Sequence, residues 1–250
     1  NEWVRGICEK PRVKCGECPH QAFLPIENQV ILDHLQGRHV VGVYPLLTDE
    51  TCWFLAADFD KTSWAEDVAA FVETCRRVDL PAAVERSRSG NGAHVWFFFA
   101  APVAASTARK MGCYLITETM TRRHQLSMES YDRLFPNQDT LPRGGFGNLI
   151  ALPLQHGPRQ MGNTVFVDDQ FVPHLDQWRF LSEHARIEAG TVDGIAREAT
   201  RKGLVVGVRL SDTADPDTSE PWTRLPSGQP RVRFSAPLPC EVSAVLAQRL

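Results

Sequence analysis

Hydrophobic and polar positions change their spacing several times between residues 52 and 135, and each change predicts a new element. The continuous apolar run CWFLAAD at 52–58 is typical of a strand that is covered on both faces. A helix follows over 64–78, because its apolar residues recur at the spacing of one helical face: Trp64, Val68, Phe71, Val72 and Cys75. The pattern then predicts a strand over 82–87, a turn at 89–92, a strand over 93–100, a helix over 104–123 and a strand over 131–135.

This order, β-α-β-β-α-β, is the split βαβ or RRM-like arrangement and predicts an α+β fold. Further strands are expected at 148–154 and 164–167. The organisation along the chain has three parts. Residues 1–25 are cysteine-rich and too few for a core, 26–205 form the main domain, and 206–250 resemble a linker or the start of a following domain, being rich in Pro, Ser, Asp and Thr.

Composition narrows the class of protein. With 43% hydrophobic and 23% charged residues among 250, the chain is neither disordered, nor collagenous, nor membrane-spanning. Its longest apolar run, 95–105, is shorter than the roughly 20 residues that cross a bilayer. The net charge of −3 means that any nucleic-acid surface must be a local one. The odd number of cysteines, 7, suggests a reducing compartment, so we expect a cytoplasmic protein with no membrane partner.

The first candidate for chemistry is the acidic end of the strand over 52–58. Asp58 and Asp60 point to the same face, because side chains alternate along a strand. Two such carboxylates repel each other, and Mg²⁺ or Mn²⁺ between them would relieve the repulsion. The alternative is that these residues simply end a strand, with Asp60 capping the next turn.

The second candidate is the glycine-bearing turn between the two strands that follow. Backbone N–H groups of a Gly-rich turn approach phosphate oxygens closely. Arg88, Ser89, Asn91 and His94 would add charge or hydrogen bonds there. The alternative is an ordinary β-hairpin with solvated arginines and a packed histidine.

Together these features resemble the archaeo-eukaryotic primase superfamily. Its first motif, Asp-x-Asp, matches Asp58 and Asp60, and its looser Ser-x-His motif matches the segment from Ser89 to His94. Longer segments, among them ERSRSGNGAHVWFFF and SYDRLFPNQDTLPRGGFGNLIALPLQ, are similar to the primase domain of TOTE conflict systems, in which a helicase follows in the same polypeptide. The resemblance covers about residues 3 to 210. It implies the archaeo-eukaryotic primase fold around the RRM-like core.

The resemblance also implies a third acid that completes the metal site. Asp132 is preferred, because it lies on a predicted strand before the segment GGFGNLIALPL. Asp168, after an apolar strand, is the alternate third ligand, and Asp139 in a predicted loop is a further competitor. Arg143 and Arg159 flank a stretch without acidic residues and are additional candidates for nucleotide binding, although each could be an incidental surface arginine.

A zinc knuckle is expected at the N-terminus. Cys8, Cys15 and Cys18 supply three thiolates for a structural Zn²⁺. The resemblance, through the segment DHLQG, favours His34 as the fourth ligand, with His20 and His39 as alternatives. Three free cysteines are the competing interpretation.

The resemblance and the residues together predict a metal-dependent nucleotidyltransferase, a DNA primase or polymerase. It would join nucleoside triphosphates on a single-stranded DNA template by two-metal-ion catalysis, with a helicase domain as partner. Asp58, Asp60 and Asp132 would bind the Mg²⁺ or Mn²⁺ ions, and His94 would contact the nucleotide. Two alternatives remain: a primase-like nucleic-acid-binding module that no longer polymerises, and a metal-dependent nuclease using the same carboxylates.

Overall fold

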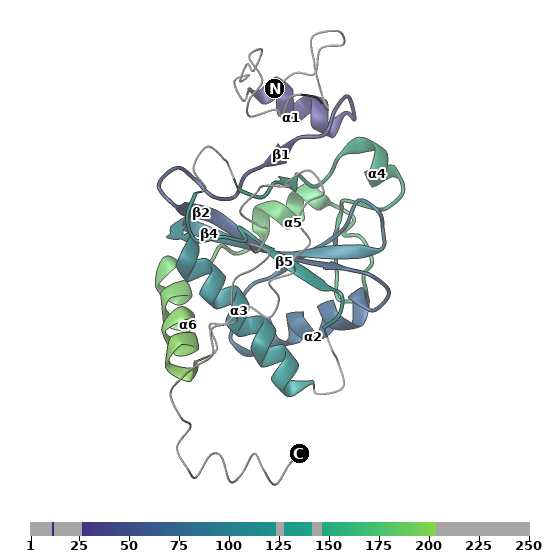
Figure 1. Ribbon diagram of the computed structural model, residues 1–250. Coiled ribbons are helices and arrows are strands. Elements are labelled where there is room, and N and C mark those ends of the chain that lie inside the picture. Colours follow the sequence, from purple (N-terminus) through teal and green to yellow (C-terminus); the bar gives the residue numbers. More distant parts are fainter. Residues whose placement is uncertain (1–11, 13–26, 124–127, 142–146, 204–250) are drawn as a thin grey trace, which may run out of the picture. The chain divides into compact units, whose positions relative to one another are not determined.

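The computed structural model describes residues 12, 27–123, 128–141 and 147–203 (Figure 1). The chain divides into two units, residues 1–210 and 211–250, and the second lies outside the described residues. Cys8, Cys15, Cys18 and Arg143, each with a predicted role, also lie outside them.

An antiparallel sheet of five strands forms the centre of the described part, in the order β5-β2-β4-β3-β7. Its strands are β2 (Thr51–Asp60), β3 (Ala83–Arg86), β4 (Gly92–Ala104), β5 (Tyr131–Phe135) and β7 (Phe166–Val167). A separate pair joins β1 (Gly42–Val43) and β6 (Ile150–Ala151). The helices are α1 (Asn28–Leu35), α2 (Trp64–Arg77), α3 (Ala105–Arg122), α4 (His156–Gln160), α5 (Gln177–Glu183) and α6 (Ala189–Lys202).

The succession β2-α2-β3-β4-α3-β5 confirms the predicted β-α-β-β-α-β order. The strand expected at 148–154 is much shorter, because only Ile150 and Ala151 pair with β1. In contrast, β4 extends past the predicted end at residue 100 to Ala104, beyond a bulge opposite Cys52 and Phe54. The short elements α1, β1, α4 and α5 and the helix α6 were not expected from the spacing of apolar residues.

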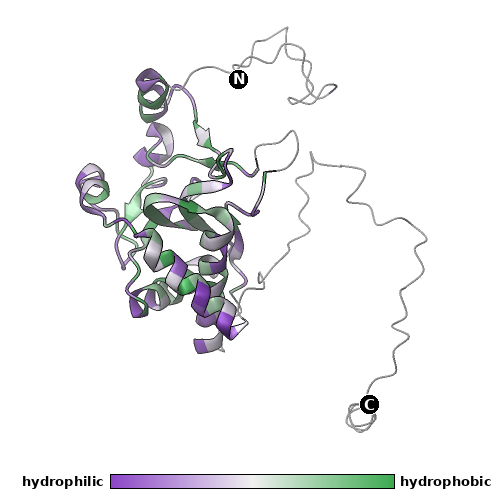
Figure 2. Ribbon diagram, turned by 90° about the vertical axis from the view of Figure 1, so that its left-hand side faces the viewer, coloured by the Kyte–Doolittle hydropathy of each residue, from purple (hydrophilic) through white to green (hydrophobic). Residues whose placement is uncertain are grey.

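The two faces of the sheet bury different cores. Leu55, Phe59 and Phe97 belong to the larger core, which packs against α2, α3 and α6 on one side (Figure 1). On the other side, Trp96 and Phe166 belong to a smaller aromatic core that α5 partly covers. Hydrophilic and hydrophobic residues alternate around these helices, as expected for helices that cover a sheet (Figure 2). The polar side chains at the end of β2 and near the start of β4 lie on the face of the sheet that buries the smaller core.

A glycine fixes how closely the hairpin of β3 and β4 approaches the end of β2. Gly92 begins β4 opposite Asp60, and a Cβ atom at this position would collide with the carbonyl oxygen of Phe59. Any side chain there would force the strands apart. Gly90, in the turn, has φ +79°, a backbone conformation that favours glycine. The turn therefore places its backbone beside the acidic end of β2.

Within the ranges given above, no helix is long and apolar enough to cross a membrane.

Candidate active site

A row of polar side chains crosses three strands at one end of the sheet. His94 on β4 is paired with Asp58 on β2 and with Glu85 on β3. Its Nε2 lies 3.5 Å from Asp58 Oδ1, and its Nδ1 lies 3.0 Å from Glu85 Oε2. The His94 side chain is 16% exposed and that of Asp58 20%, whereas Glu85 is buried. The structure therefore brings the first predicted motif and the predicted histidine into direct contact.

A β-bulge extends this row to β5. Between the pairs Ala57–Leu134 and Phe59–Tyr131, the single residue Asp58 faces two residues of β5, Asp132 and Arg133. A bulge of this kind puts an extra residue opposite one partner and changes where the side chains point. Asp132 forms an ion pair with Arg133, with 2.6 Å between Oδ2 and Nε. Both residues act on the charge of Asp58, so Asp132 lies beside the acidic motif.

The charges in this row depend on one another. Burial above all, together with the neighbouring carboxylates of Asp132 and Asp60, raises the pKa of Asp58 to about 6, against the opposing effects of His94 and Arg133. For His94, burial disfavours the charged ring, but the hydrogen bond to Glu85 and the charges of Glu85 and Asp58 outweigh burial and raise its pKa. At the end of β2, the carboxylates therefore outnumber the positive charges of His94 and Arg133.

This donor set fits a hard divalent cation. Carboxylate oxygens are the ligands that Mg²⁺ and Mn²⁺ prefer, and a cation would offset the repulsion that raises the pKa of Asp58. No three carboxylate, imidazole or thiol groups of the described segments already converge as metal ligands do. Asp60 is exposed at the last position of β2, where its side chain is accessible to a ligand.

Sequence reasoning missed the residues that hold the ends of β2 and β5 together. Asp67 of α2 is buried, and its Oδ2 accepts hydrogen bonds from Ser130 Oγ (2.5 Å) and Ser130 N (3.2 Å). The carbonyl oxygen of Ser130 in turn accepts from Asp60 N at 2.7 Å. These bonds fix the start of β5, and hence Asp132, relative to Asp60. An acidic residue in the first turn of a helix looks like an ordinary dipole partner, so the sequence carried no signal of this contact.

Glu85 was also missed, although a signal existed. A hairpin centred on Ser89 and Gly90 pairs Arg86 with Ala93, and therefore Glu85 with His94. The predicted turn at 89–92 is centred one residue later and would have placed this acid opposite Trp96, on the same face of the strand as the histidine. Trp96 completes the arrangement, because its Nε1 donates to Glu85 Oε2 at 2.8 Å.

The turn itself presents its predicted residues to solvent. Arg88, Ser89 and Asn91 are exposed, and Ser89 Oγ accepts a hydrogen bond from Asn91 N at 3.2 Å. Asn163 braces the turn by donating to the carbonyl oxygen of Arg88 at 3.2 Å. Arg86 differs from Arg88, because its guanidinium donates to the carbonyl oxygens of Gly162 and Phe171, at 3.3 and 2.6 Å. Of these two arginines, Arg88 is the one positioned for a ligand.

Other predicted residues are engaged elsewhere. Arg159 of α4 donates to the carbonyl oxygen of Leu35 at 3.4 Å and so joins α4 to α1. Asp139 forms an ion pair with Arg109 of α3. Neither contact involves the row of Asp58 and His94.

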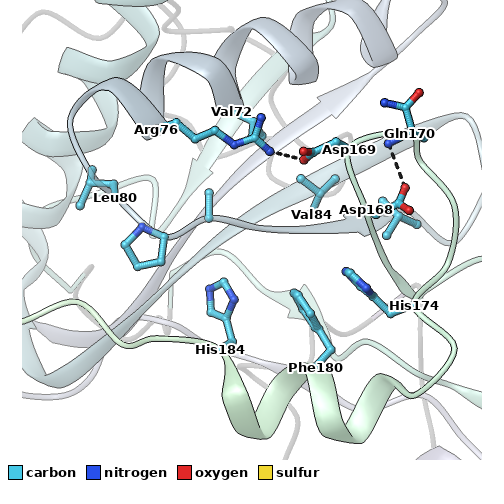
Figure 3. A pocket seen from close by; sticks show the side chains of 13 residues that line it. Val72, Arg76, Leu80, Val84, Asp168, Asp169, Gln170, His174, Phe180 and His184 are labelled. Atoms are coloured by element: carbon cyan, nitrogen blue, oxygen red, sulfur yellow. Dashed lines mark hydrogen bonds and ion pairs between the residues drawn. The ribbon is translucent and has the colours of Figure 1, made fainter.

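Asp168 lies at the opposite edge of the sheet from Asp132, since β4 and β3 separate β7 from β2. Its Oδ1 accepts from the backbone N–H groups of Gln170 and Val172, both at 2.9 Å, which closes a turn. Together with Arg76, Asp169 and His184, it lines a cavity of about 600 Å³, where Arg76 and Asp169 form an ion pair (Figure 3). The structure thus separates the alternate third ligand from the acidic motif.

His34 does not fit the role predicted for it as a zinc ligand. The ring is buried, Nδ1 accepts from Val41 N at 3.1 Å, and Nε2 lies 2.9 Å from the carbonyl oxygen of Pro153, to which it donates. Neither nitrogen keeps a lone pair for a metal. His34 instead joins α1 to the segment after β6. His39, one of the alternatives, is exposed and has its Nε2 3.3 Å from the carbonyl oxygen of Val30.

The described fold and this row of side chains define an α+β domain with an acid-and-histidine site at the strand ends of an antiparallel sheet. The family model described as the TOTE conflict system, archaeo-eukaryotic primase domain, matches residues 1–195, and the chain belongs to this family. The resemblance predicted from the motifs is thereby confirmed. No curated protein matches the chain.

Proposed function

We propose that this protein is a primase-polymerase that joins nucleotides on a single-stranded DNA template. Membership of the family supports a primase-like nucleotidyltransferase. The observation that carries the finer proposal is the row in which Asp132, Asp58 and His94 occupy three adjacent strands, β5, β2 and β4. Acids that can hold divalent cations, with a histidine beside them, suit the transfer of a nucleotidyl group, because negative charge develops on the α-phosphate and on the leaving pyrophosphate.

In this proposal Asp58, Asp60 and Asp132 bind Mg²⁺ or Mn²⁺. Such ions supply Lewis acidity for the attacking hydroxyl and for the pyrophosphate that leaves. His94 and Arg88 contact the triphosphate, and the backbone N–H groups of the turn after β3 add neutral donors. Template binding is expected to be weakly sequence-dependent, with backbone contacts and stacking as its main terms. A helicase in the same machine and a zinc site at Cys8, Cys15 and Cys18 are further parts of the proposal.

The test is nucleotide incorporation on a primed and an unprimed single-stranded template, with Mg²⁺ or Mn²⁺. We expect incorporation by the wild type and its loss in Asp58→Ala plus Asp60→Ala. The matched control is Asp168→Ala plus Asp169→Ala, which removes two acids from the opposite edge of the same sheet. Equal incorporation by the wild type and the Asp58/Asp60 variant would contradict the proposal.

The same assay separates the two alternatives. A labelled strand that shortens without nucleotides indicates a nuclease. If the protein binds nucleotide and Mn²⁺ but extends no strand, whether or not template is added, it is a binding module.

A further inference from the structure

The start of β5 is held in place by a buried carboxylate of α2. Asp67 is 1% exposed, and its Oδ2 accepts three hydrogen bonds: from Ser130 Oγ (2.5 Å), from Ser130 N (3.2 Å) and from Ser63 Oγ (3.2 Å). Ser130 is itself buried and directly precedes β5. One oxygen atom therefore joins the beginning of α2 to the beginning of β5.

The position of Asp132 depends on this contact because β5 is an edge strand of the described sheet, with β2 as its neighbour. Their ladder has two residue pairs on one side of the bulge and the single pair Phe59–Tyr131 on the other. Asp132 lies in the bulge, where the ladder is interrupted, so it stays in place only if both sides are held. The weaker side is held by Asp60 N, which donates to the carbonyl oxygen of Ser130 at 2.7 Å.

Burial makes this arrangement strict. A buried carboxylate that loses its donors is costly, so Asp67 and Ser130 favour the one geometry that keeps these bonds. Lys61 also contacts this segment, since its Nζ donates to the carbonyl oxygen of Glu129 at 3.3 Å, but that bond is exposed and water competes for it. The serine that Asp67 holds is the one that Asp60 contacts. A single buried group thus sets the spacing between the two strands that carry the acids.

We propose that Asp67 is a positioning residue for the metal site, which holds Asp132 beside Asp58 before a cation binds. The inference rests on the proposed function, because that function makes these carboxylates the metal ligands. Carboxylates that repel each other move apart unless the backbone that carries them is fixed. Groups that position metal ligands typically change the metal affinity by about 10- to 100-fold.

The test is the binding of Mn²⁺ alone to the full chain, measured by isothermal titration calorimetry without nucleotide or DNA. Binding that persists in Asp58→Ala plus Asp60→Ala is the background from other sites and is subtracted. Asp67→Ala removes the acceptor for Ser130 and should raise the Kd for Mn²⁺ by about 10- to 100-fold. Asp67→Asn keeps an oxygen that can accept from Ser130, so its Kd should stay within about fivefold of the wild type.

Two further variants separate positioning from charge. Glu66 is exposed in the same first turn of α2, so Glu66→Ala removes an equal negative charge from the surface and should leave the Kd within about twofold. Ser130→Ala removes a hydroxyl donor without changing the charge, and should raise the Kd by about three- to tenfold. Combined with Asp67→Ala it should add little, because both substitutions act through the same contact.

Hydrogen exchange measures the same role without metal. The N–H group of Asp60 donates to Ser130, so its exchange rate reports whether the ends of β2 and β5 stay together. In the metal-free protein, Asp67→Ala should accelerate this exchange by about tenfold or more, while the amides between β2 and β4 keep their protection. If Asp67→Ala does not fold, Ser130→Ala carries both measurements, with smaller effects in the same direction.

Three results overturn the inference: a Kd or an Asp60 exchange rate that is unchanged in Asp67→Ala, an Asp67→Asn protein that binds as weakly as Asp67→Ala, or an equal rise in Kd in Glu66→Ala. A wild type that binds no Mn²⁺ through Asp58 and Asp60 overturns it together with the proposed function. A wild type that binds Mn²⁺ there but incorporates no nucleotide contradicts the proposed function instead, and leaves the positioning role of Asp67 supported.

Discussion

Each edge of the central sheet carries an acid that was a candidate for the metal site, but the two acids have different surroundings. At one edge, β5 contains Asp132, and at the other, β7 is directly followed by Asp168. Asp132 lies beside Asp58 and acts on its charge, because β5 and β2 are adjacent and a bulge aligns the two residues. Asp168 instead accepts two backbone N–H groups of its own turn. The difference teaches that strand order, and not the local motif, decides which acid can share a ligand with Asp58.

The largest expected effect comes from replacing the acid at each edge in turn. Asp132→Asn should reduce nucleotide incorporation by about 10²- to 10³-fold, because the proposed function makes this carboxylate a metal ligand, and its loss would remove several kcal/mol of transition-state stabilisation. Asp168→Asn should stay within about twofold of the wild type. Steady-state incorporation at saturating Mn²⁺ measures both, and equal losses in the two variants would show that the edges are not distinct.

Stability at neutral pH gives the second contrast. Folding raises the pKa of Asp58 to about 6 from the ordinary value of 3.8, because burial and nearby carboxylates disfavour its charge. The protonated form is favoured in the folded state, so this contribution is present below pH 3.8 and is lost as pH rises through about 6. Asp58→Asn should therefore stabilise the metal-free protein at pH 7, by up to about 3 kcal/mol, while abolishing activity.

Urea unfolding without divalent ions checks this expectation, with Asp168→Asn as control. The control carboxylate accepts backbone hydrogen bonds, so its loss should leave stability unchanged or slightly lower. A less stable Asp58→Asn protein would mean that the carboxylate is stabilised by its neighbours.

The two arginines of the hairpin provide the third test. Arg86 joins β3 to the loops around β7 through the carbonyl oxygens of Gly162 and Phe171. Arg86→Ala should lower the free energy of unfolding by about 1–3 kcal/mol. Arg88→Ala should leave stability nearly unchanged and weaken nucleotide binding about tenfold, the equivalent of one charge-assisted hydrogen bond to phosphate. Denaturation and nucleotide titration on both variants would reveal whether these roles are reversed.

The smallest effect concerns His184 at the cavity beside β7. Burial lowers its pKa, and the charge of His174 lowers it further. The neutral ring is favoured in the folded state, so its contribution is fully present above the ordinary pKa of 6.5 and is lost as pH falls below it. His184→Leu should flatten the decline of Tm on the acidic side of pH 6.5. An unchanged decline would assign that dependence to other groups.

The sequence alone determined the central elements and their order. Strong helical and strand periodicities defined α2, α3 and the strands between them, because each element buries one continuous apolar face. Asp58, Asp60 and His94 were also predicted, since an acidic strand end and a glycine turn before a histidine are local features. Short elements such as α4 and β1 were beyond prediction, because two to five residues carry no periodicity.

Only the tertiary structure decided which distant residues meet. Asp132 was preferred to Asp168 from the sequence, but its position beside Asp58 depends on β5 being adjacent to β2 and on a bulge of one residue. His34 was assigned to zinc by its sequence segment, but the carbonyl oxygen of Pro153 and the N–H group of Val41 occupy its two ring nitrogens. Glu85 became significant once the hairpin register set it against His94. Local spacing encodes secondary structure and its polar ends, whereas hydrogen-bond partners far apart in the chain depend on strand order and register, which arise from packing the whole sheet.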